Sequence, residues 1–338
     1  MTPGPAPGRA ADPVRTVFFG SGAFAVPIFE ALVADPRVEL VGVVTAPDRA
    51  AGRGKLLRPT PVALKARTTW APLLQPNRLR DDDGVAAVAE IRPELGVLAD
   101  YGQIVPRTIL DLPPHGILNV HPSLLPRHRG ATPIPAAIAG GDERSGVTII
   151  RMDDGIDTGP IVAQDAWPLD GTETSPVLEA RAAIAGAALL ARTLGPWLGG
   201  ELEAVAQGDG ATLTRPFRRS HGRLDPSLPA RTLERGVRAR TGWPGSFLET
   251  SLGRLLVHRA SLGDPGAGDA PGRLIGDGHA LALTLALTTP EGRLVLDEVQ
   301  LPGGRVTTGA DLLRGHPEYG EAVVGQPAGA GEPAGAPG

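Results

Sequence analysis

The order of strand, turn and helix at the start of the chain constrains the fold more than any other feature. Apolar residues at Thr16–Phe19 predict a strand, a glycine-rich turn follows at 20–22, and Phe24–Ala34 predicts a helix. A second apolar run at Val38–Val44 predicts the next strand. This order is typical of a parallel sheet covered by helices. We therefore predict an α/β fold with a Rossmann-like parallel sheet.

The alternation continues to about residue 200 and then changes. Apolar runs predict strands at 73–75, 95–99, 146–152 and 161–165, and helices at 61–69, 84–91, 104–110, 133–139 and 174–194. A helix at 230–239 and short strands at 246–249, 254–260, 273–275, 280–287 and 293–300 predict a small β-barrel. We therefore expect a disordered tail at 1–13, an α/β domain at 14–200, a linker at 201–219, a barrel domain at 220–320 and a disordered tail at 321–338.

The composition excludes several classes of protein. With 41% hydrophobic residues and a formal charge of -4 over 338 residues, it is typical of a soluble globular chain of two domains. No apolar run approaches the roughly 20 residues of a membrane span, and the first residues lack a signal-peptide core. The absence of cysteine excludes thiolate metal sites, and no ligand cluster has usable spacing, so we expect no metal and a cytoplasmic protein.

The first turn does not carry a dinucleotide fingerprint. It lacks the G-x-G-x-x-G pattern, and Thr45 and Ala46 stand where an acidic residue would end the second strand. A nicotinamide cofactor and hydride transfer are therefore disfavoured.

An asparagine and a histidine stand two residues apart where an apolar run enters a proline-rich loop. The side-chain period of a strand places Asn119 and His121 on the same face. Asn119 can donate a hydrogen bond to a developing oxyanion, and His121 can donate one or move a proton, which suits chemistry on a carbonyl. The same residues also fit a capped strand end with one satisfied histidine, so this motif alone leaves both interpretations open.

Two further polar loops follow predicted strands. Asp100, Tyr101 and Gly102 come at the carboxyl end of the 95–99 strand, where open α/β sheets bind ligands. The loop at 153–160 follows the 146–152 strand, and its Asp157 could face His121 and orient it. Ordinary turn chemistry remains an alternative for both loops.

A basic loop spans residues 46–61 (APDRAAGRGKLLRPTP). It has no apolar period and is expected to be mobile, and its cations are Arg49, Arg53, Lys55 and Arg58. One interpretation is a solvated surface loop. The other is a loop whose arginines reach the phosphates or base edges of an RNA, for which a local patch suffices despite the negative net charge.

Together these motifs resemble the site of the folate-dependent formyltransferases. Their shared pattern, Asn-x-His-x-Ser-Leu-Leu-Pro followed by a D-G-x-D-T-G loop, is matched by residues 119–126 and 154–159. Within this superfamily the chain is similar to the methionyl-tRNA formyltransferases, because 47–55 matches their basic insertion and Arg238-Ala239 and Trp243-Pro244 precede the predicted barrel. The similarity covers about residues 14–318.

Two short stretches depart from the pattern of this family. The first turn reads Gly-Ser-Gly at 20–22 instead of the usual Gly-Thr-Pro. Residues 215–219 (RPFRR) replace a Tyr-Ala-x-Lys element at the start of the C-terminal domain.

The resemblance implies a formyltransferase domain, an OB-like tRNA-binding domain at 220–320, and an activity in translation initiation. The formyl group of 10-formyltetrahydrofolate would pass to the α-amino group of initiator methionyl-tRNA. Asn119, His121 and Asp157 would be catalytic. The folate would be bound by Leu98, Asp100, Tyr101, Gly102, Ser123, Leu124, Leu125, Pro126 and Asp153. The tRNA would be bound by Arg49, Arg53, Lys55 and Arg58.

Two other functions remain open. A folate-dependent N-formyltransferase acting on an amino-sugar nucleotide or on glycinamide ribonucleotide would share the catalytic residues but would not explain the basic loop. A non-catalytic RNA-binding protein with the barrel as its platform is disfavoured, because aromatic residues make up only 4% of the chain. We expect a monomer; the sequence does not give the tRNA identity elements or the order of substrate binding.

Overall fold

The computed structural model describes residues 12–51, 56–264, 270–278 and 283–325. The tails predicted at 1–13 and 321–338 therefore lie outside the described residues except for 12–13 and 321–325, and Arg53 and Lys55 also lie outside them. The chain forms two units: unit 1 comprises 1–133, 144–168 and 179–214, and unit 2 comprises 134–143, 169–178 and 215–338. Within the described ranges, none of the helices combines the length and apolar character that crossing a membrane requires.

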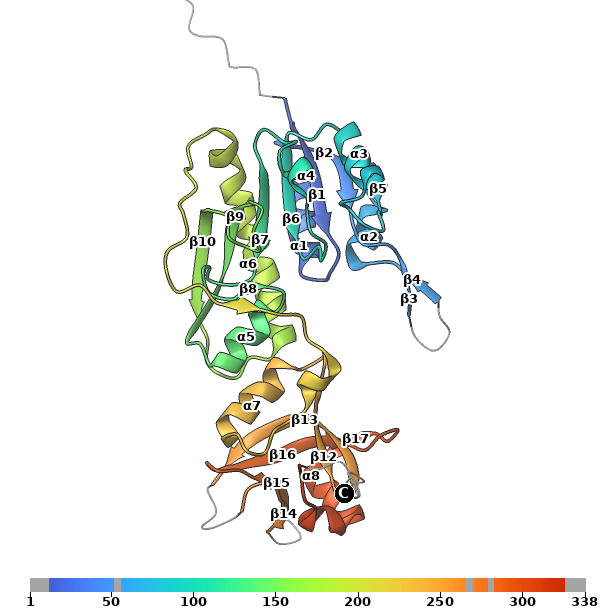
Figure 1. Cartoon of the computed structure of the whole chain (residues 1–338), viewed down its shortest axis with the longest axis vertical. Helices are drawn as coiled ribbons and strands as arrows, with labels where there is room; N and C mark the ends of the chain where they lie inside the picture. Colours follow the sequence, from blue (N-terminus) through green and yellow to red (C-terminus); the bar gives the residue numbers. More distant parts are fainter. Residues whose placement is uncertain (1–11, 52–55, 265–269, 279–282, 326–338) are drawn as a thin grey trace, which may run out of the picture. The chain divides into compact units, whose positions relative to one another are not determined.

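Buried apolar runs form a seven-stranded sheet in unit 1, in the order β10-β9-β7-β6-β1-β2-β5 (Figure 1). Five neighbouring strands, β7 to β5, are parallel, which confirms the predicted Rossmann-like sheet. β9 runs antiparallel to β7, and the edge strand β10 runs antiparallel to β9. The bounds are β1 (Val14–Gly20), β2 (Val38–Val44), β5 (Leu73–Leu74), β6 (Leu95–Ala99), β7 (Ile117–His121), β9 (Arg144–Arg151) and β10 (Ile161–Pro168).

Helices cover both faces of this sheet because successive residues of each strand point in opposite directions. On one face, Phe19 belongs to an apolar cluster with Val88 and Ile109. On the other face, the rings of Phe18 and Phe29 lie 5.1 Å apart. The helices are α1 (Ala25–Val33), α2 (Pro61–Ala66), α3 (Asp82–Glu90), α4 (Arg107–Leu110) and α6 (Ser175–Leu198).

Two segments expected to lack regular structure contain short strands. In the basic loop, β3 (Arg49–Ala51) pairs antiparallel with β4 (Leu56–Arg58). In the expected linker, β11 (Leu213–Thr214) pairs parallel with β8 (Arg129–Gly130), and Val205 forms a β-bridge with Ile161. The linker pairings join residues far apart in the sequence, so no local apolar pattern reveals them.

An antiparallel sheet forms the core of unit 2, in the order β12-β13-β16-β15-β14, with β17 paired to β16. This confirms the predicted C-terminal sheet domain, whereas β17, α8 and η2 were not predicted. Its strands are β12 (Ser246–Thr250), β13 (Gly253–Gly263), β14 (Leu274–Asp277), β15 (Thr284–Thr288), β16 (Arg293–Gln300) and β17 (Val306–Thr308). Its helices are α5 (Pro133–Gly140, of which 134–140 belong to unit 2), η1 (Arg219–Gly222), α7 (Ala230–Ala239), α8 (Gly309–Gly315) and η2 (Pro317–Glu321).

Residues 322–325 connect the two edges of the unit 2 sheet. Thr250 at the end of β12 forms a bridge with Val324, and Arg273 just before β14 forms one with Val323. The backbone N–H of Leu274 donates to the carbonyl oxygen of Ala322 at 2.8 Å. One short segment therefore pairs with both edge strands and closes the sheet, although we had expected it to be part of the disordered tail.

Candidate active site

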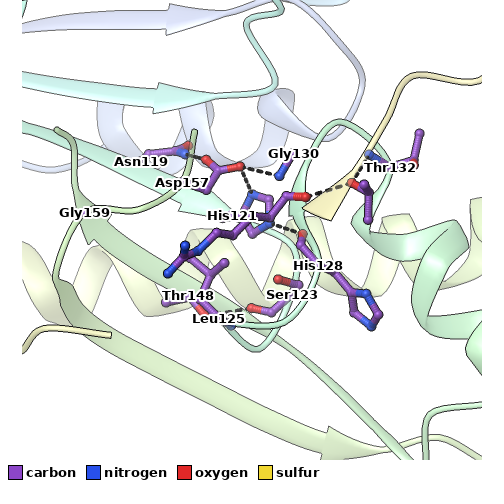
Figure 2. Close-up of polar contacts among 12 residues, drawn as sticks. Asn119, His121, Ser123, Leu125, His128, Gly130, Thr132, Thr148, Asp157 and Gly159 are labelled. Atoms are coloured by element: carbon purple, nitrogen blue, oxygen red, sulfur yellow. Dashed lines mark hydrogen bonds and ion pairs between the residues drawn. The ribbon is translucent and has the colours of Figure 1, made fainter. Parts of the chain in front are cut away.

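Strand β7 carries two polar side chains within the core of unit 1. Asn119 is 6% exposed and His121 is 5% exposed. β7 lies between β6 and β9, and its register places Asn119 opposite Leu98 on one side and Ile150 on the other. Both side chains point to the same side of the strand, as its period of two requires, and there they meet Asp157 (Figure 2).

The carboxylate of Asp157 joins the three predicted catalytic residues. Its Oδ1 accepts a hydrogen bond of 2.9 Å from Nδ2 of Asn119. Its Oδ2 accepts one of 2.8 Å from the backbone N–H of Gly130 and lies 3.5 Å from Nδ1 of His121 (Figure 2). Asp157 has a φ of +51°, a left-handed conformation that is uncommon outside glycine. The sequence therefore brings together residues from two loops and one strand at a single carboxylate.

Both ring nitrogens of His121 face acceptors. Nε2 lies 2.9 Å from the backbone carbonyl oxygen of His128, which can only accept, so Nε2 carries a proton in this arrangement. Nδ1 faces the Asp157 carboxylate, which also only accepts, so this contact is favourable when Nδ1 carries a proton too. The surrounding atoms thus fix the plane of the imidazole and favour hydrogen-bond donation from it.

The loop that carries Asp157 is shaped by its own side chains. Oδ1 of Asp153 accepts hydrogen bonds from the N–H of Gly155 at 3.1 Å and from the hydroxyl of Thr158 at 2.6 Å. Gly159 passes so close to β9 that a Cβ there would lie 1.9 Å from the carbonyl oxygen of Arg151. Asp153, which the resemblance assigned to the folate, therefore has a structural contact of its own in this turn.

Residues 123–126 form a tight loop directly after β7. The hydroxyl of Ser123 donates to the carbonyl oxygen of Arg127 at 2.7 Å, and its own carbonyl accepts from Thr148 at 2.6 Å. The side chain of Leu125 is 3% exposed, and Leu124 lies directly against Gly146. The side chains of Ser123, Leu124 and Leu125 thus stabilise the shape of this loop. A ligand would therefore contact chiefly the exposed backbone of the loop.

The end of β6 is tied to the first turn of the chain. The carbonyl oxygen of Asp100 accepts from the N–H groups of Ser21 at 2.9 Å and Gly22 at 3.3 Å. Asp100 is solvent-exposed, but protein atoms crowd around its carboxyl group. This desolvation, together with the charge of Glu179, raises the pKa of Asp100 to about 6. A Cβ on Gly22 would lie 1.6 Å from Oδ2 of Asp100, so the absent side chain at 22 leaves room for this carboxyl group.

The other residues at this strand end are apolar or turn-forming. Leu98 and Tyr101 are 8% and 3% exposed, and both belong to the apolar cluster of unit 1. Burial raises the pKa of the Tyr101 phenol, whose hydroxyl has no hydrogen-bond partner among the described residues. Gly102 adopts a φ of +78°. The Tyr101 ring is thus a core side chain, and a ligand here would meet chiefly the backbone.

The basic loop presents two of its predicted residues on the surface. Arg49 and Arg58 are exposed and stand opposite each other in the β3–β4 register. The base of this hairpin is fixed by Gln75, whose Nε2 donates to Oδ1 of Asp48 at 2.8 Å and to the carbonyl of Ala46 at 3.0 Å. Across the described residues, no group of three His, Asp or Glu side chains could hold a metal ion.

Two residues that no sequence motif predicted, Gln207 and Arg129, hold together the loops after β7 and β9. Gln207 donates through Nε2 to the carbonyl oxygens of Asp157 at 2.7 Å and Gly159 at 2.8 Å. Its Oε1 accepts from the guanidinium of Arg129 at 3.0 and 2.7 Å. Gln207 belongs to no motif or apolar period, and Arg129 lies just after the 119–126 motif without being one of its defining residues, so neither was predicted as a site residue.

Known proteins share both the sequence and the fold. The formyl transferase family matches residues 14–194, and the formyl transferase C-terminal domain matches 217–317. The methionyl-tRNA formyltransferase of Chloroflexus aurantiacus is 40% identical over 306 residues, which cover 89% of this chain and 97% of that protein. That of Roseiflexus sp. is 42% identical over 308 residues, covering 90% and 93%.

A solved structure extends the likeness to the fold. The N-formyltransferase of Helicobacter canadensis, in complex with folinic acid and dTDP-3-aminofucose, has a TM-score of 0.61 at 15% identity and covers 84% of this chain and 98% of that chain. This likeness concerns the fold, whereas the 40% identity to the Chloroflexus aurantiacus protein over nearly its whole length concerns the family. The chain therefore belongs to the formyl transferase family and, within it, to the methionyl-tRNA formyltransferases.

Proposed function

We propose that this enzyme transfers the formyl group of 10-formyltetrahydrofolate to the α-amino group of methionine on initiator tRNA. The observation that carries the proposal is the 40% identity to a methionyl-tRNA formyltransferase over 97% of that protein's length. Asn119 and His121 both contact the Asp157 carboxylate. This cluster offers the hydrogen-bond donors and the proton acceptor that such a transfer needs. The product is N-formylmethionyl-tRNA, the form used to initiate translation.

A folate is the natural formyl donor for this site. The folinic acid in the Helicobacter canadensis N-formyltransferase, which shares the fold, supports a reduced folate here. We propose that the pterin lies against the end of β6 (Leu98, Asp100, Tyr101 and Gly102) and the loops that carry Ser123–Pro126 and Asp153. Because Leu98, Tyr101 and Leu125 are buried, the backbone of these loops would make most of the contacts.

The reaction begins when the methionine amine attacks the formyl carbon. The carbonyl π-bond opens and leaves a negative charge on the formyl oxygen. An amide nitrogen carries two N–H bonds; Asp157 accepts one from Asn119, and we assign the other to this oxyanion. Donors placed in advance stabilise such a charge without having to reorganise as it forms. Protonated His121, held beside Asn119 on β7, would be the second donor through Nδ1–H, because this nitrogen lies 3.5 Å from Asp157 whereas Nε2 lies 2.9 Å from the carbonyl oxygen of His128.

Asp157 orients the donors and handles the proton. The amine must lose one proton as its bond to carbon forms, and N10 of the folate must gain one as its bond to carbon breaks. The Asp157 carboxylate, directly or through a water, is the acceptor in this site, and His121 is the group from which N10 is protonated. The formyl C=O bond forms again as the bond to N10 breaks. The proton taken by Asp157 then passes to His121, whose Nδ1 lies 3.5 Å away, so both groups return to their starting states. The net result is one C–N bond formed, one broken and one proton moved from the amine to N10.

The tRNA would be held by separate parts of the chain. We propose that Arg49, Arg53, Lys55 and Arg58 contact the acceptor end of the tRNA and that the domain at 220–320 contacts its body. The exposed positions of Arg49 and Arg58 on the β3–β4 hairpin suit contacts with phosphates, which give affinity without reading sequence.

A three-way comparison of acceptors tests the proposal. The full chain is given 10-formyltetrahydrofolate together with initiator methionyl-tRNA, elongator methionyl-tRNA or dTDP-3-aminofucose. Formylation of the initiator alone is the expected result. Formylation of the sugar nucleotide alone would keep the catalytic roles but reject tRNA as the substrate, and no formylation of any acceptor would reject the activity.

A further inference from the structure

The segment Val205–Thr214 runs along the two loops that form the catalytic site. At one end, Val205 and Ile161 exchange backbone hydrogen bonds of 2.7 and 2.8 Å beside the Asp157 loop. At the other end, Thr212 accepts from the backbone N–H groups of His128 and Arg129, at 2.8 and 2.9 Å. His128 is the residue whose carbonyl faces His121. This segment therefore touches the surroundings of both His121 and Asp157.

Gln207 lies between these two ends and uses its whole side-chain amide. Its two N–H bonds go to the carbonyl oxygens of Asp157 and Gly159, at 2.7 and 2.8 Å. Its oxygen accepts from Nε and Nη2 of Arg129, at 3.0 and 2.7 Å. Carbonyls only accept and a guanidinium only donates, so this is the one orientation of the amide that satisfies all four contacts.

The contact with Asp157 falls at a residue whose backbone conformation is unfavourable. The residue has a φ of +51°, a left-handed conformation that a non-glycine residue keeps only when its surroundings hold it. The backbone hydrogen bond from Gln207 holds the carbonyl of the same residue whose carboxylate meets Asn119 and His121. Rotation of this peptide would swing the carboxylate away from both.

We infer that Gln207 is a positioning residue for the formyl transfer: it holds Asp157 in its left-handed conformation so that the carboxylate faces Asn119 and His121. It acts through Asp157 and does not touch the reacting atoms. This inference rests on the proposed function, because it assigns Gln207 a part in that reaction. The rival interpretation is that Gln207 merely joins two loops and contributes only to the stability of the fold.

The variant Gln207→Met separates these interpretations, because methionine is similar in shape but makes none of the four hydrogen bonds. The control is Arg37→Met. Arg37 makes a similar set of contacts, to Asp35 at 2.8 and 2.6 Å and to the carbonyl of Ala191 at 2.9 Å. It precedes β2 at the amino end of the parallel strands, the opposite edge from the end of β7. Both variants should lower Tm.

Only Gln207→Met should lower kcat for formylation of initiator methionyl-tRNA, by about 100-fold, because small displacements of catalytic groups cost factors of this size. The KM values for both substrates should change little. A double-mutant cycle with Asp157→Ala gives the decisive measurement. If Gln207 acts through Asp157, adding Gln207→Met to Asp157→Ala should lower kcat by no more than roughly 3-fold, since the effects of residues that act as a unit do not add.

Two results would overturn the inference: kcat of Gln207→Met within about 3-fold of the unmutated enzyme, or the full 100-fold loss persisting in the Asp157→Ala background. If Gln207→Met does not fold, Gln207→Glu replaces it, because a glutamate keeps the acceptors for Arg129 but places an oxygen against two carbonyls. Its kcat should fall in the same way, and unchanged kcat would reject the inference. Failure of the proposed function is distinct, because the unmutated enzyme itself would then not formylate the tRNA.

Discussion

The backbone N–H of Gly130 donates a hydrogen bond of 2.8 Å to Oδ2 of Asp157, so the loop after β7 and the loop after β9 converge on one carboxylate. Gly130 has a φ of +95°, and a Cβ there would lie 2.4 Å from the carbonyl oxygen of Thr214. Glycine at 130 therefore allows both the close approach of β11 and the amide contact with Asp157.

Replacement of Gly130 by alanine should reduce both stability and turnover. The new methyl group cannot be accommodated without moving the backbone of β8 or β11, and we expect a loss of about 1–3 kcal/mol in the free energy of unfolding. The shift should also move the amide away from Asp157 and lower kcat. Chemical denaturation and steady-state formylation measure the two effects.

Gly171→Ala is the matched control for this change. Gly171 has a similar φ of +86°, but nothing lies within 4 Å of where its Cβ would be. It should show the backbone strain alone, with kcat unchanged. Equal losses of kcat in the two variants would contradict a specific role for the Gly130 amide.

Asn119→Ala should leave a folded enzyme that binds the folate and turns over slowly. Loss of one oxyanion donor typically lowers kcat by about 10²–10³. The lost hydrogen bond to Asp157 should cost only about 1 kcal/mol of stability. Circular dichroism, titration with the folate and single-turnover formylation check the three parts. An unfolded protein would instead favour a structural role for this buried amide.

Arg53→Ala and Arg58→Ala should weaken the reaction with tRNA far more than the binding of folate. Each lost phosphate contact should reduce the slope of log(kcat/KM) against log salt by about 1. The control is Arg192→Ala on α6, whose guanidinium pairs with Asp165. Equal effects of either variant on the KM for folate and on the KM for tRNA would argue against the basic loop as a tRNA contact.

Asp100→Asn should change how stability depends on pH. Because the pKa of Asp100 is raised from 3.8 to about 6 in the folded protein, the folded state holds its proton more tightly than the unfolded state. The free energy of unfolding should therefore fall as pH rises from about 4 to about 6 and then level off.

In Asp100→Asn this fall should be absent, so at pH 7 the variant should be more stable than the unmutated protein. We expect a difference of about 1 kcal/mol or less, because Asp100 as a residue is solvent-exposed and water screens part of the effect. The difference between the two unfolding curves, measured over this pH range, isolates Asp100 from the other carboxylates. A constant difference across the range would contradict the raised pKa.

The apolar pattern predicted the elements whose burial is continuous. The runs at β2 and β6 gave the observed bounds because the last four residues of β2 and all five residues of β6 are buried. The period of two also placed Asn119 and His121 on one side before the fold was known. The D-G-x-D-T-G loop added Asp157, although only the structure shows that its carboxylate meets both of the others.

The parts that the sequence did not predict depend on contacts between distant residues. β11 pairs with β8 over more than 80 positions, and Gln207 finds its partners at 129, 157 and 159. A glutamine in a polar stretch is not part of an apolar period. Its hydrogen-bond partners come together only when the chain folds. The β3–β4 hairpin likewise lacks the alternating apolar residues that mark a strand.

The closure of the unit 2 sheet by residues 322–325 has a consequence for solubility. An edge strand with free N–H and C=O groups is a template on which another chain can add a strand and aggregate. Here β12 and β14 both bond to the same short segment at Val323 and Val324. Deleting residues 322–325 would therefore expose two edges at once, and the shortened protein would be prone to self-association through added strands.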